Sequence, residues 1–186
     1  MKLWLVRHGR PDIDDQLPIR GSDFKPWVDA YDAAPLDASV QPSDELRGLA
    51  ASAGCIVTST LRRSLESAAL LGAATPTLSD AAFREAEIPG ALLGGRWGPH
   101  HWAKLFRIAW YFGYSPGVES FSAARARARV AAAQLDQLAS QHTSVMLVAH
   151  GMINGYVAWA LRSRGWRGPS AFGGDYWAHY EFDKPG

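Results

Sequence analysis

The chain has little of three features that would narrow its class at once: cysteine, a long apolar run and an excess of charge. Cys55 is the one cysteine among 186 residues, which excludes an internal disulfide. Lys and Arg number 19 and Asp and Glu 18, so the formal net charge of +1 gives no electrostatic reason to expect nucleic acid. No apolar stretch approaches the roughly 18 residues of a membrane helix. The N-terminus leads into a predicted strand rather than a signal peptide, so we expect a cytoplasmic protein with no membrane partner.

What is present is an ordinary globular composition with alternating strand and helix patterns. Hydrophobic residues make up 47% of the chain and charged residues 20%, and the length suits one domain over residues 1–186. Short apolar runs alternate with helical patterns, which is typical of a parallel α/β sheet. An aromatic segment over 96–114 is predicted to be helical, within an insertion at about 89–117. The loop 10–42 is predicted to hold a short helix near 25–31, and short strands are expected at 75–78 and 176–182.

Polar groups follow three of the apolar runs at the point where each predicted strand ends. The runs cover 3–6, 55–57 and 145–149, and each is suited to a strand buried on both faces. Ligands bind at the carboxyl edge of such sheets, so we expect these groups to converge there. The groups that follow the three runs are Arg7-His8-Gly9, Arg62-Arg63 and His150-Gly151.

These residue types favour phosphoryl chemistry. Arginine forks bind the oxygens of a phosphoryl group, and a neutral imidazole nitrogen is a competent nucleophile near pH 7. A half-buried carboxylic acid can supply the proton that a leaving alcohol needs. The remaining histidines have no companion ligands at metal spacing, so we expect no metal and no cofactor. They are His100, His101, His142 and His179.

Five motifs in order resemble the histidine phosphatase superfamily, the group that contains cofactor-dependent phosphoglycerate mutase. They are Arg7-His8-Gly9, the Ser59–Ala68 element, Phe83-Arg84-Glu85, Glu119-Ser120-Phe121 and His150-Gly151. The resemblance implies a phosphoglycerate mutase-like three-layer α/β/α sandwich around a mostly parallel sheet.

The resemblance also implies a role for each site residue. His8 would be the phosphorylated nucleophile, Glu85 the proton donor and His150 a second catalytic group. Phosphate would be bound by Arg7, Arg63, His150, Gly9 and Gly151, with Arg62 pointing away. The chain departs from the family at Asp14, where an Asn is usual, and after Glu85, which makes Glu87 a rival donor.

The implied activity is that of a phosphomonoester phosphatase with a phosphohistidine intermediate on His8 and a small phosphorylated substrate. Two alternatives stay open: a phosphoglycerate mutase-type phosphotransferase, and a phospho-ligand binding module without turnover. The substrate and the oligomeric state are not set by the sequence. Arg125, Arg127 and Arg129 lie in a predicted long helix, and we expect a solvated face there rather than a nucleic-acid site.

Overall fold

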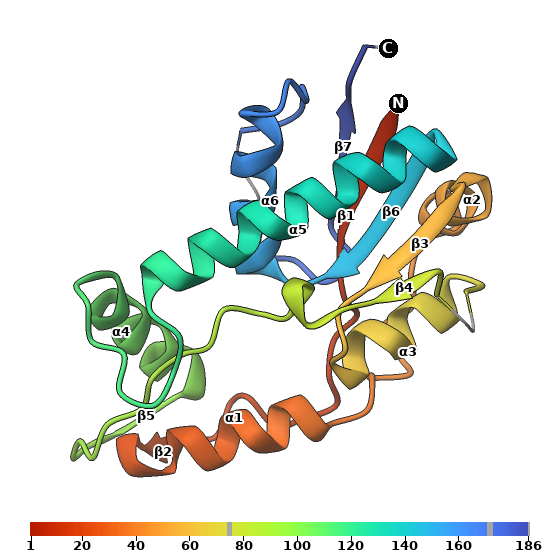
Figure 1. Cartoon of the computed structure of the whole chain (residues 1–186). Coiled ribbons are helices and arrows are strands. Elements are labelled where there is room, and N and C mark those ends of the chain that lie inside the picture. The colour runs from red at the N-terminus through yellow and green to blue at the C-terminus, as the bar shows by residue number, and fades with distance from the viewer. Residues whose placement is uncertain (74–75, 171–172, 186) are drawn as a thin grey trace.

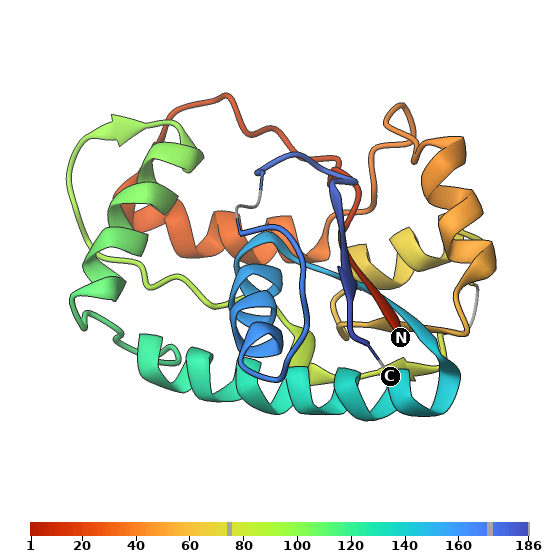
Figure 2. The ribbon, with the colours of Figure 1, turned by 90° about the horizontal axis from the view of Figure 1, so that it is seen from above.

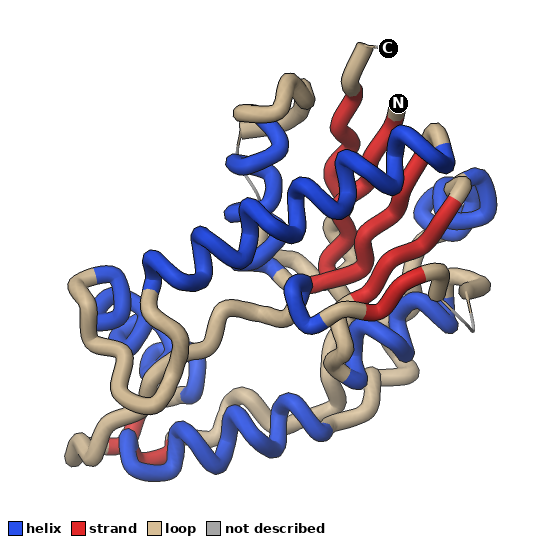
Figure 3. Tube along the Cα trace, viewed as in Figure 1, coloured by secondary structure: helices blue, strands red, loops and turns tan. Residues whose placement is uncertain are grey.

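Five strands form one sheet in the order β4-β3-β6-β1-β7 in the computed structural model, which describes residues 1–73, 76–170 and 173–185 (Figures 1 and 3). The first four pair in parallel, and β7 runs antiparallel to β1 at the edge. The predicted α/β fold with a mostly parallel sheet is therefore confirmed. The strands are β1 (Lys2–Arg7), β3 (Cys55–Thr58), β4 (Leu78–Ser79), β6 (Ser144–Ala149) and β7 (His179–Asp183).

The central strands are apolar throughout because both of their faces are covered. Side chains alternate between the faces of a strand, so Leu3 and Leu5 enter one hydrophobic cluster while Trp4 and Val6 enter another. β6 repeats the pattern, since Val145 and Leu147 belong to the first cluster and Met146 and Val148 to the second. The two clusters hold helices against both faces of the sheet.

The helices form the two outer layers of the sandwich. α5 (Phe121–His142) and α6 (Gly151–Arg162) cover one face of the sheet, and α2 (Asp44–Ser52) and α3 (Arg62–Leu70) cover the other (Figure 2). α5 begins at Ser120, whose hydroxyl accepts a hydrogen bond from Ala123 N at 3.2 Å, as an N-cap should. Its buried stripe is nearly all alanine, which lets the helix lie close to α6.

Two further helices and a small strand pair lie beyond the carboxyl ends of the strands (Figure 1). They are α1 (Phe24–Ala33), α4 (Pro99–Tyr111) and the antiparallel pair of β2 (Ile19–Arg20) with β5 (Arg96–Trp97). Single 3-10 turns precede α1 at Gly21–Asp23 and follow β4 at Ala81–Phe83.

Three predicted boundaries were wrong in this region and at the last strand. The helix at 25–31 is longer, because Pro26 sits in its first turn, where no backbone N–H is needed. The helix at 96–114 starts only at Pro99, since Arg96 and Trp97 pair as a strand. The last strand begins at His179, because Trp177 turns the backbone with φ 63°.

The two remaining predictions are a short strand at 75–78 and the lack of a membrane-spanning helix. The short strand at 75–78 starts outside the described residues at Thr75, and Leu78 and Ser79 pair with β3. Within residues 1–73, 76–170 and 173–185, no helix is long and apolar enough to cross a membrane.

Candidate active site

Three of the predicted residues meet at the carboxyl ends of β1 and β6. The rings of His8 and His150 are buried with centroids 5.0 Å apart. Arg63, at the start of α3, is also buried, and its Nε lies 3.2 Å from His8 Nε2 and 3.2 Å from His150 Nδ1. One guanidinium N–H is thus shared between two imidazoles.

The hydrogen bonds fix which nitrogen of each ring carries the proton. His8 Nδ1 lies 2.7 Å from the Gly9 carbonyl oxygen, which can only accept, so Nδ1 is the protonated nitrogen. His8 Nε2 then carries a lone pair, as its contact with Arg63 requires. His150 accepts through Nδ1 and donates through Nε2 to Ser59 Oγ at 2.7 Å. The free lone pair of His8 therefore faces the guanidinium, where an anion would bind.

Burial and positive charge keep both histidines neutral. Burial is the main cause that lowers the pKa of His8 well below its usual value, and the nearby cations of Arg63 and Arg7 lower it further. The pKa of His150 is lowered in the same way, first by burial and then by Arg63. A neutral imidazole is the form that can attack phosphorus.

Gly9, the residue after His8, allows the Trp177 ring to pack close to the backbone. A Cβ at Gly9 would clash with the Trp177 ring. The Gly9 N–H donates to Ser67 Oγ at 2.8 Å, and that hydroxyl donates to the Arg63 carbonyl at 2.6 Å. Ser67, in the motif that begins at Ser59, thus connects the loop after β1 to α3. A phosphate contact from Gly9 stays a prediction.

Arg7 lies at the mouth of the same cluster. Its Nη1 donates to the Gly174 carbonyl, and its guanidinium carbon lies 4.3 Å from the centre of the Tyr176 ring. Its Nε is buried and has no hydrogen-bond partner among the described residues. A Cβ at Gly151, the first residue of α6, would lie 3.8 Å from this Nε. Arg7 therefore keeps one donor for an incoming anion beside the helix start.

Two tyrosines cover the arginines, which the sequence did not predict. The Arg63 guanidinium carbon lies 5.0 Å from the Tyr31 ring centre, as Arg7 lies against Tyr176. The two hydroxyl oxygens are 3.4 Å apart. Burial raises the pKa of Tyr31, so this phenol stays protonated. Tyr31 on α1 and Tyr176 before β7 together form an aromatic cover over the site.

Asp32 is the second residue that sequence reasoning missed. Its Oδ1 lies 2.6 Å from Arg63 Nη1, so a carboxylate occupies the outer edge of the buried guanidinium. The Asp32 side chain is 40% exposed and the Arg63 side chain 3%. The sequence held little signal for this contact. Asp32 lies near the C-terminal end of α1, and the local sequence pattern does not show that this end lies over the site.

The structure brings one of the two rival carboxylates to this centre. Glu85 accepts hydrogen bonds from the backbone N–H groups of Met152 at 3.1 Å and Ile153 at 3.0 Å, in the first turn of α6. That helix begins directly after His150. Glu87 is exposed and accepts from the backbone of Glu119 at 3.3 Å. A carboxylate at a helix N-terminus is a stable arrangement, and here it fixes Glu85 beside the second histidine.

Two arginines hold the segment that carries Glu85. Arg127 donates to the carbonyls of Ala82 at 2.9 Å and Arg84 at 2.7 Å, and it pairs with Glu119. Arg107 on α4 donates to the carbonyl of Ala86 at 2.7 Å. The expectation that Arg127 is a solvated surface residue was therefore wrong, because its fork is half-buried between α5 and this segment.

The geometry is matched by comparison with known proteins. Residues 43–183 match the profile of the histidine phosphatase superfamily, branch 1. The chain belongs to the histidine phosphatase superfamily. No curated protein matches the sequence.

Solved histidine phosphatase folds superpose on nearly the whole chain. A mycobacterial glucosyl-3-phosphoglycerate phosphatase in complex with VO3 has a TM-score of 0.61 at 24% identity, covering 97% of this chain and 90% of that one. A candidate alpha-ribazole-5′-phosphate phosphatase from Escherichia coli has a TM-score of 0.54 at 18% identity, covering 88% and 78%. These similarities confirm the fold that was predicted from the motifs.

Within this member of the histidine phosphatase superfamily, the site holds groups that phosphoryl transfer can use. A neutral imidazole and the Arg63 guanidinium meet at the sheet edge, Arg7 lies beside them, and the Glu85 side chain is bound to the first turn of the helix that follows His150. Among the described residues, no three His, Cys, Asp or Glu side chains gather as a metal site. The positive charge next to His8 that the structure shows comes from the guanidinium groups of Arg63 and Arg7.

Proposed function

We propose that the protein is a phosphomonoester phosphatase that works through a phosphohistidine on His8. The observation that carries the proposal is the shared N–H of Arg63, which lies 3.2 Å from His8 Nε2. This contact supports the proposal, because it holds the lone pair of His8 within hydrogen-bond distance of a guanidinium that can bind phosphate. Family membership supports the reaction class, because residues 43–183 match histidine phosphatases.

In the first step, His8 Nε2 attacks phosphorus and the bond from phosphorus to the ester oxygen breaks. Arg7 and Arg63 stabilise the charge on the phosphoryl oxygens, and His150, whose Nδ1 accepts from Arg63 Nε, helps to hold that guanidinium in place. The ester oxygen leaves as an alcohol after it takes the proton of the Glu85 carboxylic acid. The products of this step are the alcohol, phosphohistidine and the Glu85 carboxylate.

In the second step, water attacks the phosphohistidine and the phosphorus–nitrogen bond breaks. The Glu85 carboxylate takes one proton from the water, which restores its acid form. Inorganic phosphate leaves, and His8 returns to the neutral state with Nδ1–H on the Gly9 carbonyl, as observed at 2.7 Å. The same two residues thus serve both halves of the reaction.

Hydrolysis is favoured over mutase activity by the charge around Arg63. A mutase must hold a second anionic group of its small substrate beside the reacting phosphoryl group. Here Asp32 occupies the outer edge of Arg63 at 2.6 Å, and a carboxylate there repels such a group. The tyrosine cover adds aromatic surface, which favours a substrate with an apolar part.

A paired assay tests the proposal. The purified protein is incubated with a panel of phosphomonoesters, and separately with 3-phosphoglycerate and catalytic 2,3-bisphosphoglycerate. We expect phosphate release from the panel without isomerisation, and its loss in His8→Ala. Fast isomerisation with little phosphate release would identify a mutase, and binding of phosphate without turnover would identify a binding module.

A further inference from the structure

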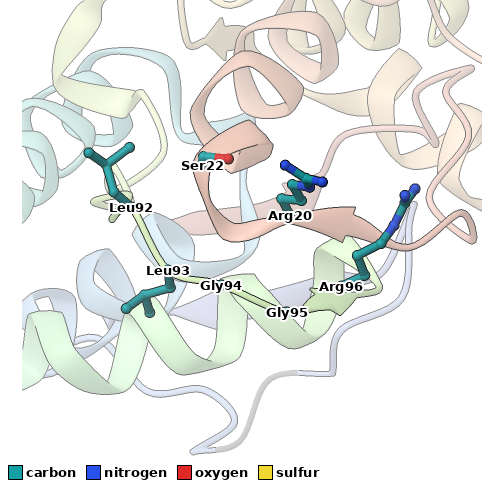
Figure 4. Close-up of a pocket in the computed structure, with 7 residues that line it drawn as sticks. All are labelled: Arg20, Ser22, Leu92, Leu93, Gly94, Gly95 and Arg96. Atoms are coloured by element: carbon teal, nitrogen blue, oxygen red, sulfur yellow. The ribbon is translucent and has the colours of Figure 1, made fainter.

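Two arginines face each other on the strand pair beyond the sheet. Arg20 in β2 lies directly opposite Arg96 in β5. Directly opposed residues of an antiparallel pair point to the same face, and like charges there are destabilising. Figure 4 shows both side chains rising on the same side of the pair. The fold thus sets two positive charges side by side at some cost in stability.

Neither guanidinium is neutralised by the protein. In the described ranges 1–73, 76–170 and 173–185, no carboxylate lies within ion-pair distance of Arg20 or Arg96. Arg96 Nη2 donates to the Pro18 carbonyl at 3.3 Å, a contact that leaves its charge uncompensated. Two acids of the preceding loop are engaged elsewhere: Asp15 pairs with His100, and Asp14 accepts from the backbone of its own turn.

The two arginines line a pocket. Its volume is about 430 Å³, within the range of small-molecule sites. The other walls are Ser22 and the run 92–95, so no acidic side chain lines it (Figure 4). Gly94 and Gly95 contribute backbone alone, and Gly95 has φ +91°. The lining therefore offers two guanidinium forks and an open stretch of main chain, while the Ser22 hydroxyl donates to Asp23 Oδ1 at 3.2 Å.

We propose that this pocket binds an anionic oxyacid group, a phosphate or a carboxylate, of a small molecule. Guanidinium forks bind such groups with paired, charge-assisted hydrogen bonds. The pocket is distinct from the histidine site, because α1 separates them. From Phe24 to Asp32 the helix rises about 12 Å, so one phosphate cannot reach both His8 and the arginine pair.

The anion has two sources with the same chemistry. It is either the far end of an extended substrate whose phosphate lies at His8, or a separate small molecule. A chain of ring contacts joins the two places: Tyr31 stacks on Trp27 at 5.4 Å, and Trp102 stacks on Trp97, beside Arg96, at 4.8 Å. Phe24 and Phe106 complete the chain between them. Phe24, Phe106 and Trp102 are buried, so a substrate lying along α1 would contact only the partly exposed rings of Tyr31, Trp27 and Trp97.

Sulfate titration followed by the backbone amide signals of Gly94 and Gly95 tests the proposal. We expect saturable shifts in the wild-type protein and in His8→Ala. The double variant Arg20→Gln/Arg96→Gln should raise the apparent Kd for sulfate about tenfold or more. Arg167→Gln, which removes an exposed arginine elsewhere, should leave this Kd unchanged. Unchanged amide signals of Gly9 and Gly151 in the arginine variants show that these variants are folded. If the double variant does not fold, the two single variants take its place. Shifts that do not saturate, or an unchanged Kd in the double variant, would overturn the proposal.

A second arm separates the two sources and rests on the proposed phosphatase function. It compares octyl phosphate with 1,8-octanediol bisphosphate as substrates. If the pocket binds the far end of the substrate, the double variant raises KM about tenfold for the bisphosphate only. If a separate anion binds, KM changes for neither while sulfate binding is still lost. Absence of turnover would refute the phosphatase and leave the titration to decide the pocket.

Discussion

At the scale of the residue, Glu85 and Glu87 have different surroundings although two positions separate them. The Glu85 side chain accepts a hydrogen bond from the first turn of α6, whereas the Glu87 side chain accepts one from the backbone N–H of Glu119. We predict that Glu85→Gln slows hydrolysis of an alkyl phosphate by about 10²–10⁴-fold. It should slow p-nitrophenyl phosphate far less, because nitrophenolate leaves without a proton. Steady-state kinetics on both substrates, with Glu87→Gln as the matched control, give the answer. Equal losses on both substrates would remove Glu85 from the acid role.

Arg62 and Arg63 form a second matched pair. Arg63 is buried against both histidines, whereas Arg62 is half-exposed and bonds to Glu66 at 2.5 Å. Arg63→Lys keeps the charge but loses the fork, so kcat/KM should fall roughly 10–100-fold. Arg62→Lys should change it less than about twofold. A larger effect at Arg62 would contradict the placement of the phosphate.

The residues that end the buried strands could be predicted, and the residues that cover them could not. Arg7, His8 and His150 follow apolar runs whose burial sets where a parallel strand ends. Arg63 came from its motif, and the choice over Arg62 from family resemblance. Tyr31 and Asp32 on α1, and Tyr176 before β7, reach the site through tertiary packing that no local pattern contains.

At the scale of the element, α1 brings Tyr31 and Asp32 against the Arg63 guanidinium, for which we propose a role in phosphate binding. The helix packs Phe24 against Phe106 of α4 with ring centroids 5.1 Å apart, and its C-terminal end carries Asp32 to Arg63. The local sequence predicts a helix near 25–31, because Lys25, Trp27 and Val28 fit one. Its C-terminal end at Ala33 contacts α3, where Arg62 donates to the Ala33 carbonyl at 3.0 Å, and no local pattern contains that contact.

The contact between Asp32 on α1 and Arg63 predicts that a substitution at the site improves phosphate binding instead of weakening it. The Asp32 carboxylate competes with phosphate oxygens for Arg63 Nη1, 2.6 Å away. We expect Asp32→Asn to lower the inhibition constant for inorganic phosphate severalfold. Asp29→Asn, which removes a carboxylate paired with Lys25 on the exposed side of the same helix, is the control. A higher inhibition constant in Asp32→Asn would show instead that the carboxylate holds Arg63 in position.

At the scale of the whole molecule, the two neutral histidines couple stability to pH. Their pKa values are lowered in the folded protein, chiefly by burial, while the unfolded chain titrates near 6.5. Below that pH the unfolded state binds more protons, so stability falls as pH falls. The pKa of Asp37 is lowered by its hydrogen bonds to Ser39, so acids of its kind lose their contribution only below about pH 4.

Urea unfolding at several pH values tests this coupling. Between about pH 6.5 and 5.5 we expect a loss of up to about 1.4 kcal/mol per histidine for each pH unit. His150→Gln should roughly halve the slope, whereas His101→Gln, an exposed histidine on α4, should leave it unchanged. A flat profile across this range would mean that the two histidines bind protons equally in the folded and unfolded states.

The sandwich itself was predictable because its layers follow from residue patterns. Runs such as Leu3–Val6 are buried on both faces, and that burial requires helices on either side. The antiparallel pairing of β7 with β1 and the pairing of Arg20 with Arg96 were not predictable, since both join segments far apart in sequence. A single domain over 1–186 stays a prediction.

The most direct test of the account is to trap the phosphoenzyme by rapid quench with a ³²P-labelled substrate and to map the label. We predict an acid-labile, base-stable phosphoramidate on His8 that is absent in His8→Ala and present in Arg62→Lys. Label on Ser59 or Ser64, or turnover with no trapped intermediate in an active enzyme, would contradict a reaction through His8.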